Sequence, residues 1–494
     1  MTKAVDYSRI VGTAESLGDN ALDRHRFLDK SVLLTGDIEF LATPNGRNCF
    51  LDSARLLMRM VRNLKVQIPA ACGLNGEVAA ILNATSAPSR VVVCEPANEG
   101  LEAYDAILSV GSSARSDLPW TAVNSNGWTA RLSSKGGSLS SDSSVDNPIG
   151  ALGAACLGAA EVFKRLIRLK PTHGDLQDTL AFSLYSYRPE DAPGPAMPEE
   201  LPINLLLTGA GAIGNGILHL LRSLPVSGQI LIVDGQSYGP ENFATGILVE
   251  PQYFGVPKAL AAEKWMARRL TAKGFHEQIE TFKERLGKEF AYPALVINGL
   301  DKISARRAVQ DIWPDQIIDG AIGATSCEVT LHPWGPDLAC LKCDFEEAAV
   351  PAEVIQEQAT GLRRDRLSDV NSVVNDEDIA AAPIDKREWL RARRGKQICS
   401  VISGGVAASM SEVSQPAGFA PSVPFVACLS SCMIVTELVR YVKNWPSVLE
   451  TGFQFDVMVG PQYGQRKSHA RKRNCICQNR REEIELFRRT RRKI

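Results

Sequence analysis

The stretch INLLLTGAGAIGNGILHLLRSL, Ile203–Leu224, contains an apolar run, a glycine-rich turn and a helical pattern. Its apolar residues Leu205–Thr208 predict a buried strand, which Gly209, Gly211 and Gly214 follow directly. Glycines let the backbone approach a phosphate closely, and the N-terminus of the next helix offers free N–H groups and a favourable dipole. The stretch therefore predicts a nucleotide site on a strand–turn–helix unit.

The segments after this unit continue to alternate between strand and helix patterns. Buried strands are predicted at 229–235, 294–301 and 316–322, and a helix is predicted at 304–313. Alternating strands and helices favour a parallel sheet with both faces covered, so we expect an α/β fold.

The N-terminal part of the chain repeats this order in a weaker form. Strands are predicted at 31–36, 90–96 and 104–111, and helices at 49–64 and 150–169. The long helix 150–169 has a counterpart at 425–442. We therefore predict two diverged copies of one Rossmann-like unit, of which the second alone keeps the glycine loop.

Composition divides the chain at several points. Residues 1–187 form the first predicted unit, and the Pro-rich, acidic stretch 188–202 is a predicted linker, because proline interrupts helices and central strands. The second unit spans 203–343 and returns at 424–465 after a charged insertion at 344–423.

Two further stretches have distinct compositions. The Ser/Gly-rich stretch 133–144 is predicted to be a mobile loop. The basic tail 466–494 is predicted to be solvated or to form a last helix, with an anchor for an acidic partner as the alternative.

Bulk properties exclude several classes of protein. The chain has 494 residues, of which 45% are hydrophobic, and a formal net charge of -1. No overall positive field attracts nucleic acid, and no apolar run reaches the roughly 18 residues of a membrane helix. The N-terminus shows no apolar signal region, so we expect a cytoplasmic protein.

Three further residues bear on the identity of the nucleotide. Asp234 ends the strand after the glycine helix, where a carboxylate can accept hydrogen bonds from ribose hydroxyls. Lys258 would neutralise triphosphate charge, and Asp301, at the end of a strand, would hold Mg²⁺ on phosphate oxygens. These residues favour ATP over NAD or FAD. The alternatives are a surface lysine and an aspartate that caps a helix.

The order of the motifs GAGAIG, VDGQSYGPENFATG, GVPKA, NGLDKISARRAV and CLKC, within 203–343, resembles the ThiF/MoeB/HesA adenylyltransferases and the ubiquitin-activating enzymes. The resemblance implies that Gly209, Gly211 and Gly214 cradle ATP, that Asp234 binds the ribose, and that Lys258 and Asp301 act on the phosphates and Mg²⁺. It also implies that both units are ThiF-type adenylation domains, the first inactive and the second active, fused as a pseudo-dimer.

Two family positions need separate comment. Asn242 matches the first residue of the family's Asn-rich segment. Arg306 matches an arginine that follows the Mg²⁺-binding aspartate, where a structural salt bridge is an equally good interpretation. The family usually has Asn and Arg where this chain has Ala244 and Thr245, so a cation near the phosphates is missing.

Another arginine could replace this missing cation. LDRHRFLDKSVLLTG resembles the N-terminal helix and strand with which an inactive half supplies an arginine to its partner. The resemblance points to Arg24 or Arg26 as the donor. The alternative for both is an ordinary surface arginine.

Five cysteines are candidates for chemistry. The CxxC pair Cys340 and Cys343 suits a tetrahedral metal, and the resemblance implies that the tail's CxC pair, Cys475 and Cys477, completes a structural zinc site. The alternative is four reduced thiols. Cys399, in GKQICSVISGG, follows a basic stretch that favours thiolate, and this string resembles the cysteine segment of autophagy-type activating enzymes.

The resemblance implies that Cys399 holds the carrier as a thioester, although it could instead be a buried structural cysteine, and Cys327 is a weaker candidate. We therefore predict ATP-dependent adenylation of a small ubiquitin-like carrier, thioester formation, and transfer to a conjugating enzyme. The resemblance implies a compact bacterial ubiquitin-like pathway, with antiviral defence as one role that it suggests. The rival predictions are a sulfur-carrier adenylyltransferase, an NAD-dependent oxidoreductase and a non-catalytic scaffold. A homodimer is a further possibility.

Overall fold

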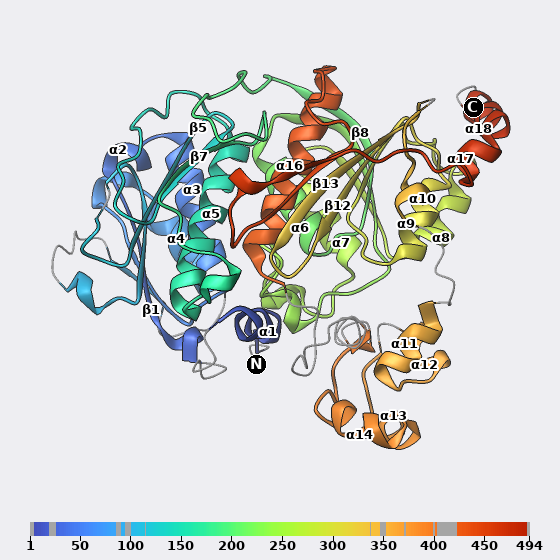
Figure 1. The fold of residues 1–494 in the computed structure, drawn as a ribbon, viewed down its shortest axis with the longest axis horizontal. Helices are drawn as coiled ribbons and strands as arrows, with labels where there is room; N and C mark the ends of the chain where they lie inside the picture. Colours follow the sequence, from blue (N-terminus) through green and yellow to red (C-terminus); the bar gives the residue numbers. More distant parts are fainter. Residues whose placement is uncertain are drawn as a thin grey trace.

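Two mixed sheets lie side by side in the computed structural model of the chain, with long helices between them and a separate group of short helices at one edge (Figure 1). The structure describes residues 4–18, 26–84, 90–93, 100–113, 115–335, 337–345, 352–369, 372–398, 401–402 and 422–491. The fold is α/β, with two Rossmann-like units.

The first sheet has seven strands in the order β3-β2-β1-β4-β5-β6-β7. The first five strands in this order, from β3 through β2, β1 and β4 to β5, pair in parallel. β6 and β7 add antiparallel pairs. The strands are β1 (Ser31–Gly36), β2 (Asn63–Gln67), β3 (Arg90–Val93), β4 (Ala106–Val110), β5 (Trp120–Asn126), β6 (Thr129–Ser133) and β7 (Thr179–Ser183).

The second sheet repeats this order with one added strand: β10-β9-β8-β11-β12-β13-β14-β15. Again five strands run in parallel and the remaining pairs are antiparallel. The strands are β8 (Leu201–Thr208), β9 (Val226–Val233), β10 (Thr271–Phe275), β11 (Leu295–Asn298), β12 (Gln316–Ile322), β13 (Ser326–Pro333), β14 (Gly452–Asp456) and β15 (Gln465–Lys467).

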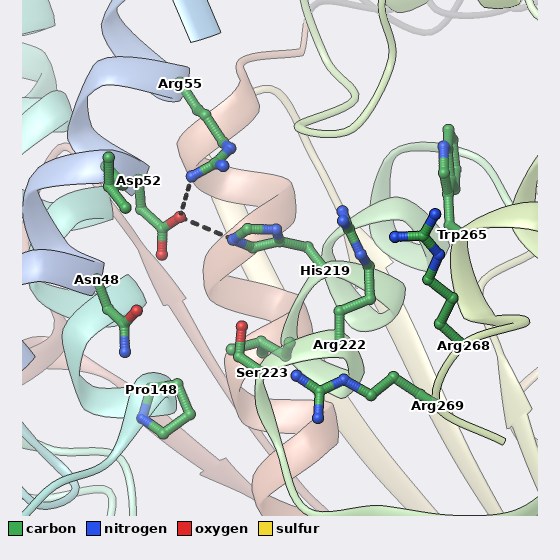
Figure 2. A pocket seen from close by; sticks show the side chains of 12 residues that line it. Asn48, Asp52, Arg55, Pro148, His219, Arg222, Ser223, Trp265, Arg268 and Arg269 are labelled. Carbon is green, nitrogen blue, oxygen red and sulfur yellow. Dashed lines mark hydrogen bonds and ion pairs between the residues drawn. The ribbon is translucent and has the colours of Figure 1, made fainter. Parts of the chain in front are cut away.

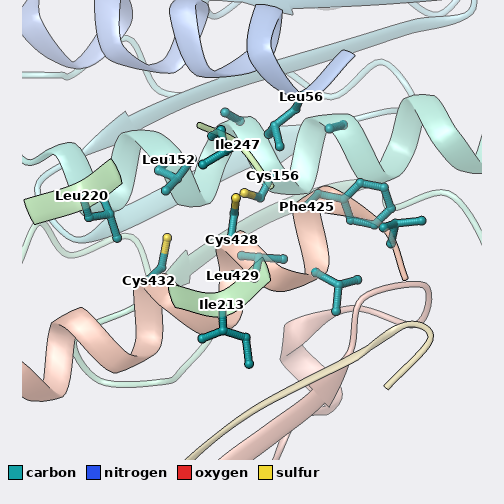
Figure 3. Close-up of a cluster of buried hydrophobic side chains, with 14 of the residues drawn as sticks. Leu56, Leu152, Cys156, Ile213, Leu220, Ile247, Phe425, Cys428, Leu429 and Cys432 are labelled. Carbon is teal, nitrogen blue, oxygen red and sulfur yellow. The ribbon is translucent and has the colours of Figure 1, made fainter. Parts of the chain in front are cut away.

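Four helices form the seam between the two units. They are α3 (Pro44–Leu57) and α5 (Pro148–Ile167) from the first unit, and α6 (Ala212–Ser223) and α16 (Pro424–Lys443) from the second. Their side chains share one apolar core, which includes Leu56 and Leu152 from the first unit and Ile213 and Phe425 from the second (Figure 3). The seam buries α5 and α16 on nearly all sides, which explains their apolar composition, whereas α3 also carries polar residues.

Helix α16 is long and apolar enough to span a membrane by length and composition. However, 89% of its most apolar window is buried inside the protein, as expected for a core helix. Tyr187, which follows β7, donates a 2.9 Å hydrogen bond to the buried carboxylate of Glu437 in α16, so the first unit also satisfies a polar group of this helix.

The other helices cover the outer faces or connect strands. They are α1 (Ser8–Leu17), α2 (Ile38–Leu41), α4 (Asn75–Asn83), α7 (Lys258–Met266), α8 (Ile279–Phe282), α9 (Ile303–Gln310), α10 (Leu341–Asp344), α11 (Ala352–Thr360), α12 (Arg364–Ser368), α13 (Asp376–Ala381), α14 (Ile384–Arg391), α17 (Ile476–Asn479) and α18 (Arg481–Arg491).

Three local predictions differ from the structure. The helix predicted at 49–64 begins at Pro44, because Thr43 caps it, and ends at Leu57, so that 63–67 becomes a strand. The stretch 133–144 is tied down: the side chain of Asn124 donates to Ser140 O at 3.0 Å. The predicted linker 188–202 packs against the turn between β5 and β6, where Trp128 donates to Pro195 O at 2.7 Å, and its last two residues already belong to β8.

Two peripheral segments have distinct roles in the fold. Helices α11 to α14 surround their own small core, which includes Leu390 and Ile398, and lie apart from the sheets (Figure 1). The basic tail ends in helix α18, where the buried guanidinium groups of Arg488 and Arg491 donate to the main-chain carbonyls of Ile312, Trp313 and Pro314 just after α9. The tail is therefore part of the second unit.

Candidate active site and cysteine cluster

The glycine loop lies where β8 ends and α6 begins. Gly209 has a φ of +88°, a left-handed conformation that favours glycine, and a Cβ at Gly214 would lie 2.1 Å from Gly209 O. A Cβ at Gly211, by contrast, would meet nothing within 4 Å. Gly211 is also the N-cap of α6 and provides no side-chain hydrogen bond to the helix. The first N–H groups of α6 are therefore left available for an anion.

A chain of hydrogen bonds joins this loop to two predicted residues. Asp234 follows β9, and its carboxylate accepts from Ala210 N and Gln236 N, both at 2.8 Å. The ammonium group of Lys258, at the first position of α7, donates to Gln236 Oε1 at 2.8 Å. Both predicted side chains are more than nine-tenths buried. The structure thus brings Asp234 and Lys258 together behind the glycine loop.

Tyr238 supports the same loop and was not predicted. Its hydroxyl donates to Ala210 O at 2.6 Å and accepts from Asn215 Nδ2 at 2.9 Å, while its ring lies 5.8 Å from the Lys258 ammonium group. A single tyrosine in a segment rich in Gly and Asn forms no helix or strand pattern that could have predicted its role. The only signal in the sequence was its position between Asp234 and Lys258.

Asn242 lies in a buried turn of the segment after β9. Its side-chain oxygen accepts from Gly239 N at 2.8 Å, so part of its hydrogen-bonding capacity closes the turn. Ala244 and Thr245, where the family residues are missing, are also buried. Both residues therefore face the protein interior and not the solvent.

An arginine from the first unit reaches this segment. Arg59, just after α3, donates to Gly246 O and Val249 O, each at 3.0 Å, and its guanidinium lies 5.0 Å from the centre of the Phe243 ring. Arg59 therefore orders the segment through its carbonyls. The sequence pointed instead to Arg24, which lies outside the described residues, and to Arg26, an exposed residue that begins a short turn before β1.

The loop after β11 carries Asp301. A Cβ at Gly209 would lie 3.0 Å from Gly299, so this loop packs directly against the glycine loop. Asp301, two residues further on, is exposed. An exposed carboxylate beside a phosphate loop fits a Mg²⁺ ligand.

Arg306 lies in a buried ion pair. Its guanidinium donates to the Asp319 carboxylate and, at 3.1 Å, to Gly320 O. Burial raises the pKa of Asp319, and the positive charge of Arg306 opposes that shift. Asn298 donates to the same carboxylate at 2.6 Å and accepts from Thr208, so the network braces the ends of β8, β11 and β12. In this structure Arg306 forms a structural salt bridge with Asp319, which is the second of the two interpretations given above.

The two cysteine pairs converge at the far end of the second sheet. The sulfur atoms of Cys340, Cys343, Cys475 and Cys477 all lie within 4.8 Å of one another. The sulfur–sulfur distance is 3.8 Å for Cys340–Cys343 and 3.6 Å for both Cys340–Cys475 and Cys343–Cys477. Tetrahedral zinc with Zn–S bonds of about 2.3 Å requires sulfur separations of about 3.8 Å.

The donor set therefore fits a closed structural Zn²⁺ site, and the CxC spacing is no obstacle. Cys340 and Cys475 are the N-cap residues of α10 and α17, where helix dipoles favour thiolate. Hydrogen bonding from Cys340 lowers the pKa of Cys475 to about 7.

The predicted nucleophile Cys399 lies outside the described residues. Its described neighbours Ile398 and Val401 belong to the core of the α11–α14 group. Cys327 lies within β13, and burial raises the pKa of its thiol well above the usual value, which disfavours it as a nucleophile.

Comparisons with known proteins place most of the second unit in a known family. The model of the ThiF family matches residues 202–478, more than half of the chain. The protein y4jF of Sinorhizobium fredii, described as uncharacterized, is 26% identical over 400 residues, which cover 75% of this chain and 75% of that protein.

Among solved structures, the crystal structure of E. coli MccB with selenomethionine MccA matches with 12% identity and a TM-score of 0.34. That match covers 55% of this chain and 65% of MccB, which is just under two thirds of its length. The family match supports an adenylyltransferase as the enzyme class. On the strength of residues 202–478, the chain belongs to the ThiF family.

Proposed function

We propose that this chain binds ATP with the loop after β8 and adenylates the C-terminal carboxylate of a small ubiquitin-like carrier protein. The observation that supports this proposal is the glycine loop before an uncapped helix, with Asp234 and Lys258 linked to it by hydrogen bonds. In this arrangement the N-terminus of α6 binds phosphate and Asp234 binds ribose.

Catalysis of the first step would consist of positioning and charge neutralisation. An oxygen of the carrier's carboxylate attacks the α-phosphorus of ATP, the bond from that phosphorus to the bridging oxygen breaks, and pyrophosphate leaves. Lys258 provides a positive charge, and Gln236 holds its ammonium group in one orientation. Mg²⁺, bound by Asp301, would neutralise further phosphate charge.

In the second step, the thiolate of Cys399 would attack the carbonyl carbon of the acyl-adenylate, and AMP would leave. The carrier would then pass as a thioester to the cysteine of a conjugating enzyme. One observation supports an approach between the α11–α14 group and the ATP site: Lys396 and Gln397 line a cavity of about 550 Å³ together with Pro240 and Glu241, which lie in the segment after Asp234.

The first test is direct titration of the full chain with ATP and Mg²⁺. We expect one ATP per chain and a loss of affinity of at least about tenfold in Lys258→Ala, because an oriented charge is removed next to the phosphates. Lys264→Ala, an exposed lysine on the same helix, is the matched control and should bind normally. Equal ATP affinity in Lys258→Ala and Lys264→Ala would contradict the proposed position of the ATP phosphates beside Lys258.

The second test is ATP–pyrophosphate exchange with a panel of small β-grasp proteins, each with and without its C-terminal glycine. Exchange that requires the glycine establishes adenylation. A thiol-sensitive gel shift that disappears in Cys399→Ala establishes the thioester. Exchange without a shift would favour a sulfur-carrier adenylyltransferase, and ATP binding without exchange for any carrier that binds would favour a scaffold.

A further inference from the structure

A second pocket with strongly basic walls lies on the seam between the two units. It measures about 270 Å³ and is enclosed by α3 of the first unit, α6 of the second, and the end of α7 (Figure 2). Four arginines line it: Arg55, Arg222, Arg268 and Arg269. The nucleotide site proposed above uses none of them.

The pocket is separate from the glycine loop. Arg222 lies in the last turn of α6, whereas Gly211 caps its first turn. At 1.5 Å per residue, the two ends of this helix are about 16 Å apart. The C-terminal end of a helix carries the negative end of its dipole, so the arginines themselves must make this pocket positive.

The acidic groups near the pocket do not balance its charge. Asp52 accepts from His219 at 2.7 Å and from Arg55 at 3.3 Å, so its carboxylate already has two partners, as the dashed lines in Figure 2 show. Within the described part of the chain, Arg222, Arg268 and Arg269 have no carboxylate partner at ion-pair distance.

The arginines also repel one another. Partial desolvation lowers the pKa of Arg222, and the charge of Arg55 lowers it further. Tyr253 and Glu250 oppose this shift, and Arg269 adds the smallest lowering contribution. The whole chain has a net charge of only -1, so this concentration of like charge does not follow from a basic composition. Like charges gathered in a pocket without counter-charges favour binding of an anion.

We propose that this pocket binds a small molecule that carries two or more phosphate groups. Guanidinium groups form paired hydrogen bonds with phosphate oxygens, and several can act on one ligand. Trp265, Leu51 and Pro148 give the pocket an apolar wall that suits an organic part of the ligand, and its volume restricts the ligand to a small one.

The test uses isothermal titration of inorganic pyrophosphate into the full chain at constant ionic strength. In a Lys258→Ala background, which weakens phosphate binding at the glycine loop, we expect saturable binding that remains. Adding Arg222→Ala and Arg269→Ala should weaken it at least tenfold. The matched control adds Arg480→Ala, an exposed arginine of the basic tail, and should bind as the background does.

Arg222 and Arg269 keep solvent-accessible side chains although the pocket partly desolvates Arg222, and their removal relieves repulsion. The thermal midpoint of the double variant should therefore stay the same or rise. Pyrophosphate should raise the midpoint of the background but not of the double variant. The proposal is overturned if no pyrophosphate binds, if binding is unchanged in the double variant, or if succinate or a glutamate-rich peptide binds the pocket more tightly than pyrophosphate does.

Discussion

The loops after β1 and after β8 occupy equivalent places in two sheets with the same strand order, yet they differ in chemistry. After β8, three glycines lead directly to α6, whose first turn has no side-chain cap. After β1, Asp37 follows, a short helix intervenes, and α3 begins only at Pro44. There Thr43 accepts from Gly46 N at 3.0 Å, so an N–H group of the first turn is already bonded.

Asp37 also places a carboxylate at the end of β1. It accepts from Ser112 N at 3.0 Å, and a Cβ at Gly111 would lie 2.1 Å from its oxygen, so no space remains between the two loops. A negative charge and a capped helix both oppose phosphate binding. The comparison teaches that the same sheet order and seam are compatible with two very different loops, of which only the loop after β8 suits the proposed phosphate site.

The largest expected effect concerns the cysteine cluster, which closes the second unit. The described part of the first unit has no comparable group of cysteines. Cys343→Ser should reduce bound zinc from one to below one per chain and should destabilise the second unit, since structural zinc contributes on the order of 10 kcal/mol of binding free energy.

Elemental analysis and chelator-dependent thermal unfolding measure both effects. Cys72→Ser, in the first unit, is the control and should change neither. Full stability of Cys343→Ser in a chelator would show that the second unit needs no metal.

Arg59 tests whether the first unit organises the nucleotide segment of the second. Arg59→Met keeps the apolar stem but leaves the carbonyls of Gly246 and Val249 without their donor. We expect a loss of about 2–3 kcal/mol in the free energy of unfolding, from the desolvation of these buried groups. Denaturant unfolding measures this loss.

The matched control is Arg62→Met, which removes an exposed ion pair with Asp29 and should cost less than about 1 kcal/mol. Equal costs for the two variants would mean that the contact across the units adds little.

Two glycines of the same loop should behave differently. Gly214→Ala brings a Cβ within 2.1 Å of Gly209 O and should cost about 1–3 kcal/mol of stability. Gly211→Ala meets nothing within 4 Å and should leave stability within about 0.5 kcal/mol, while it lowers ATP affinity because the methyl group obstructs the phosphate. Unfolding curves and ATP titrations of both variants separate these effects. An unchanged ATP affinity in Gly211→Ala would place the phosphates elsewhere.

The smallest effect concerns the contact between the α11–α14 group and the N-terminal segment. Burial raises the pKa of Asp6, but hydrogen bonds from Lys396 and Ser8 outweigh it, so the pKa lies below its usual value. The contribution of this contact is therefore fully present above about pH 4 and is lost as the pH falls through the lowered value.

At neutral pH, Asp6→Asn should raise hydrogen exchange in residues 352–398 about two- to fivefold, because the contact is partly exposed. Asp376→Asn, which removes an exposed ion pair within the group, is the control. Equal exchange in both variants would show that the group is held elsewhere.

The sequence predicted most of the parallel strands and the long seam helices, because buried strands and helices have clear apolar patterns. It also predicted the convergence of two cysteine pairs more than a hundred residues apart. It missed the parallel strands β2, β5 and β10 and the antiparallel strands β6, β7 and β13–β15. In β2, NLKVQ has weak alternation and follows a helix without a Gly or Pro break.

Two features of the site were beyond a reading of local patterns. Arg59 acts on carbonyls 187 and 190 residues away, and only tertiary packing sets such a contact. Arg306 matched a family position, but whether its charge faced a ligand or Asp319 depended on the approach of β12. The roles of Cys399 and Arg24 remain predictions.

The seam of α3, α5, α6 and α16 also has a consequence for concentration. Two separate chains that met through such a surface would come apart on sufficient dilution, and their partnership would depend on how much of each the cell makes. In a single chain the encounter is intramolecular, so its effective concentration does not change with expression level. We therefore expect the specific activity of the enzyme to stay constant on dilution, including at concentrations at which two separate chains would dissociate.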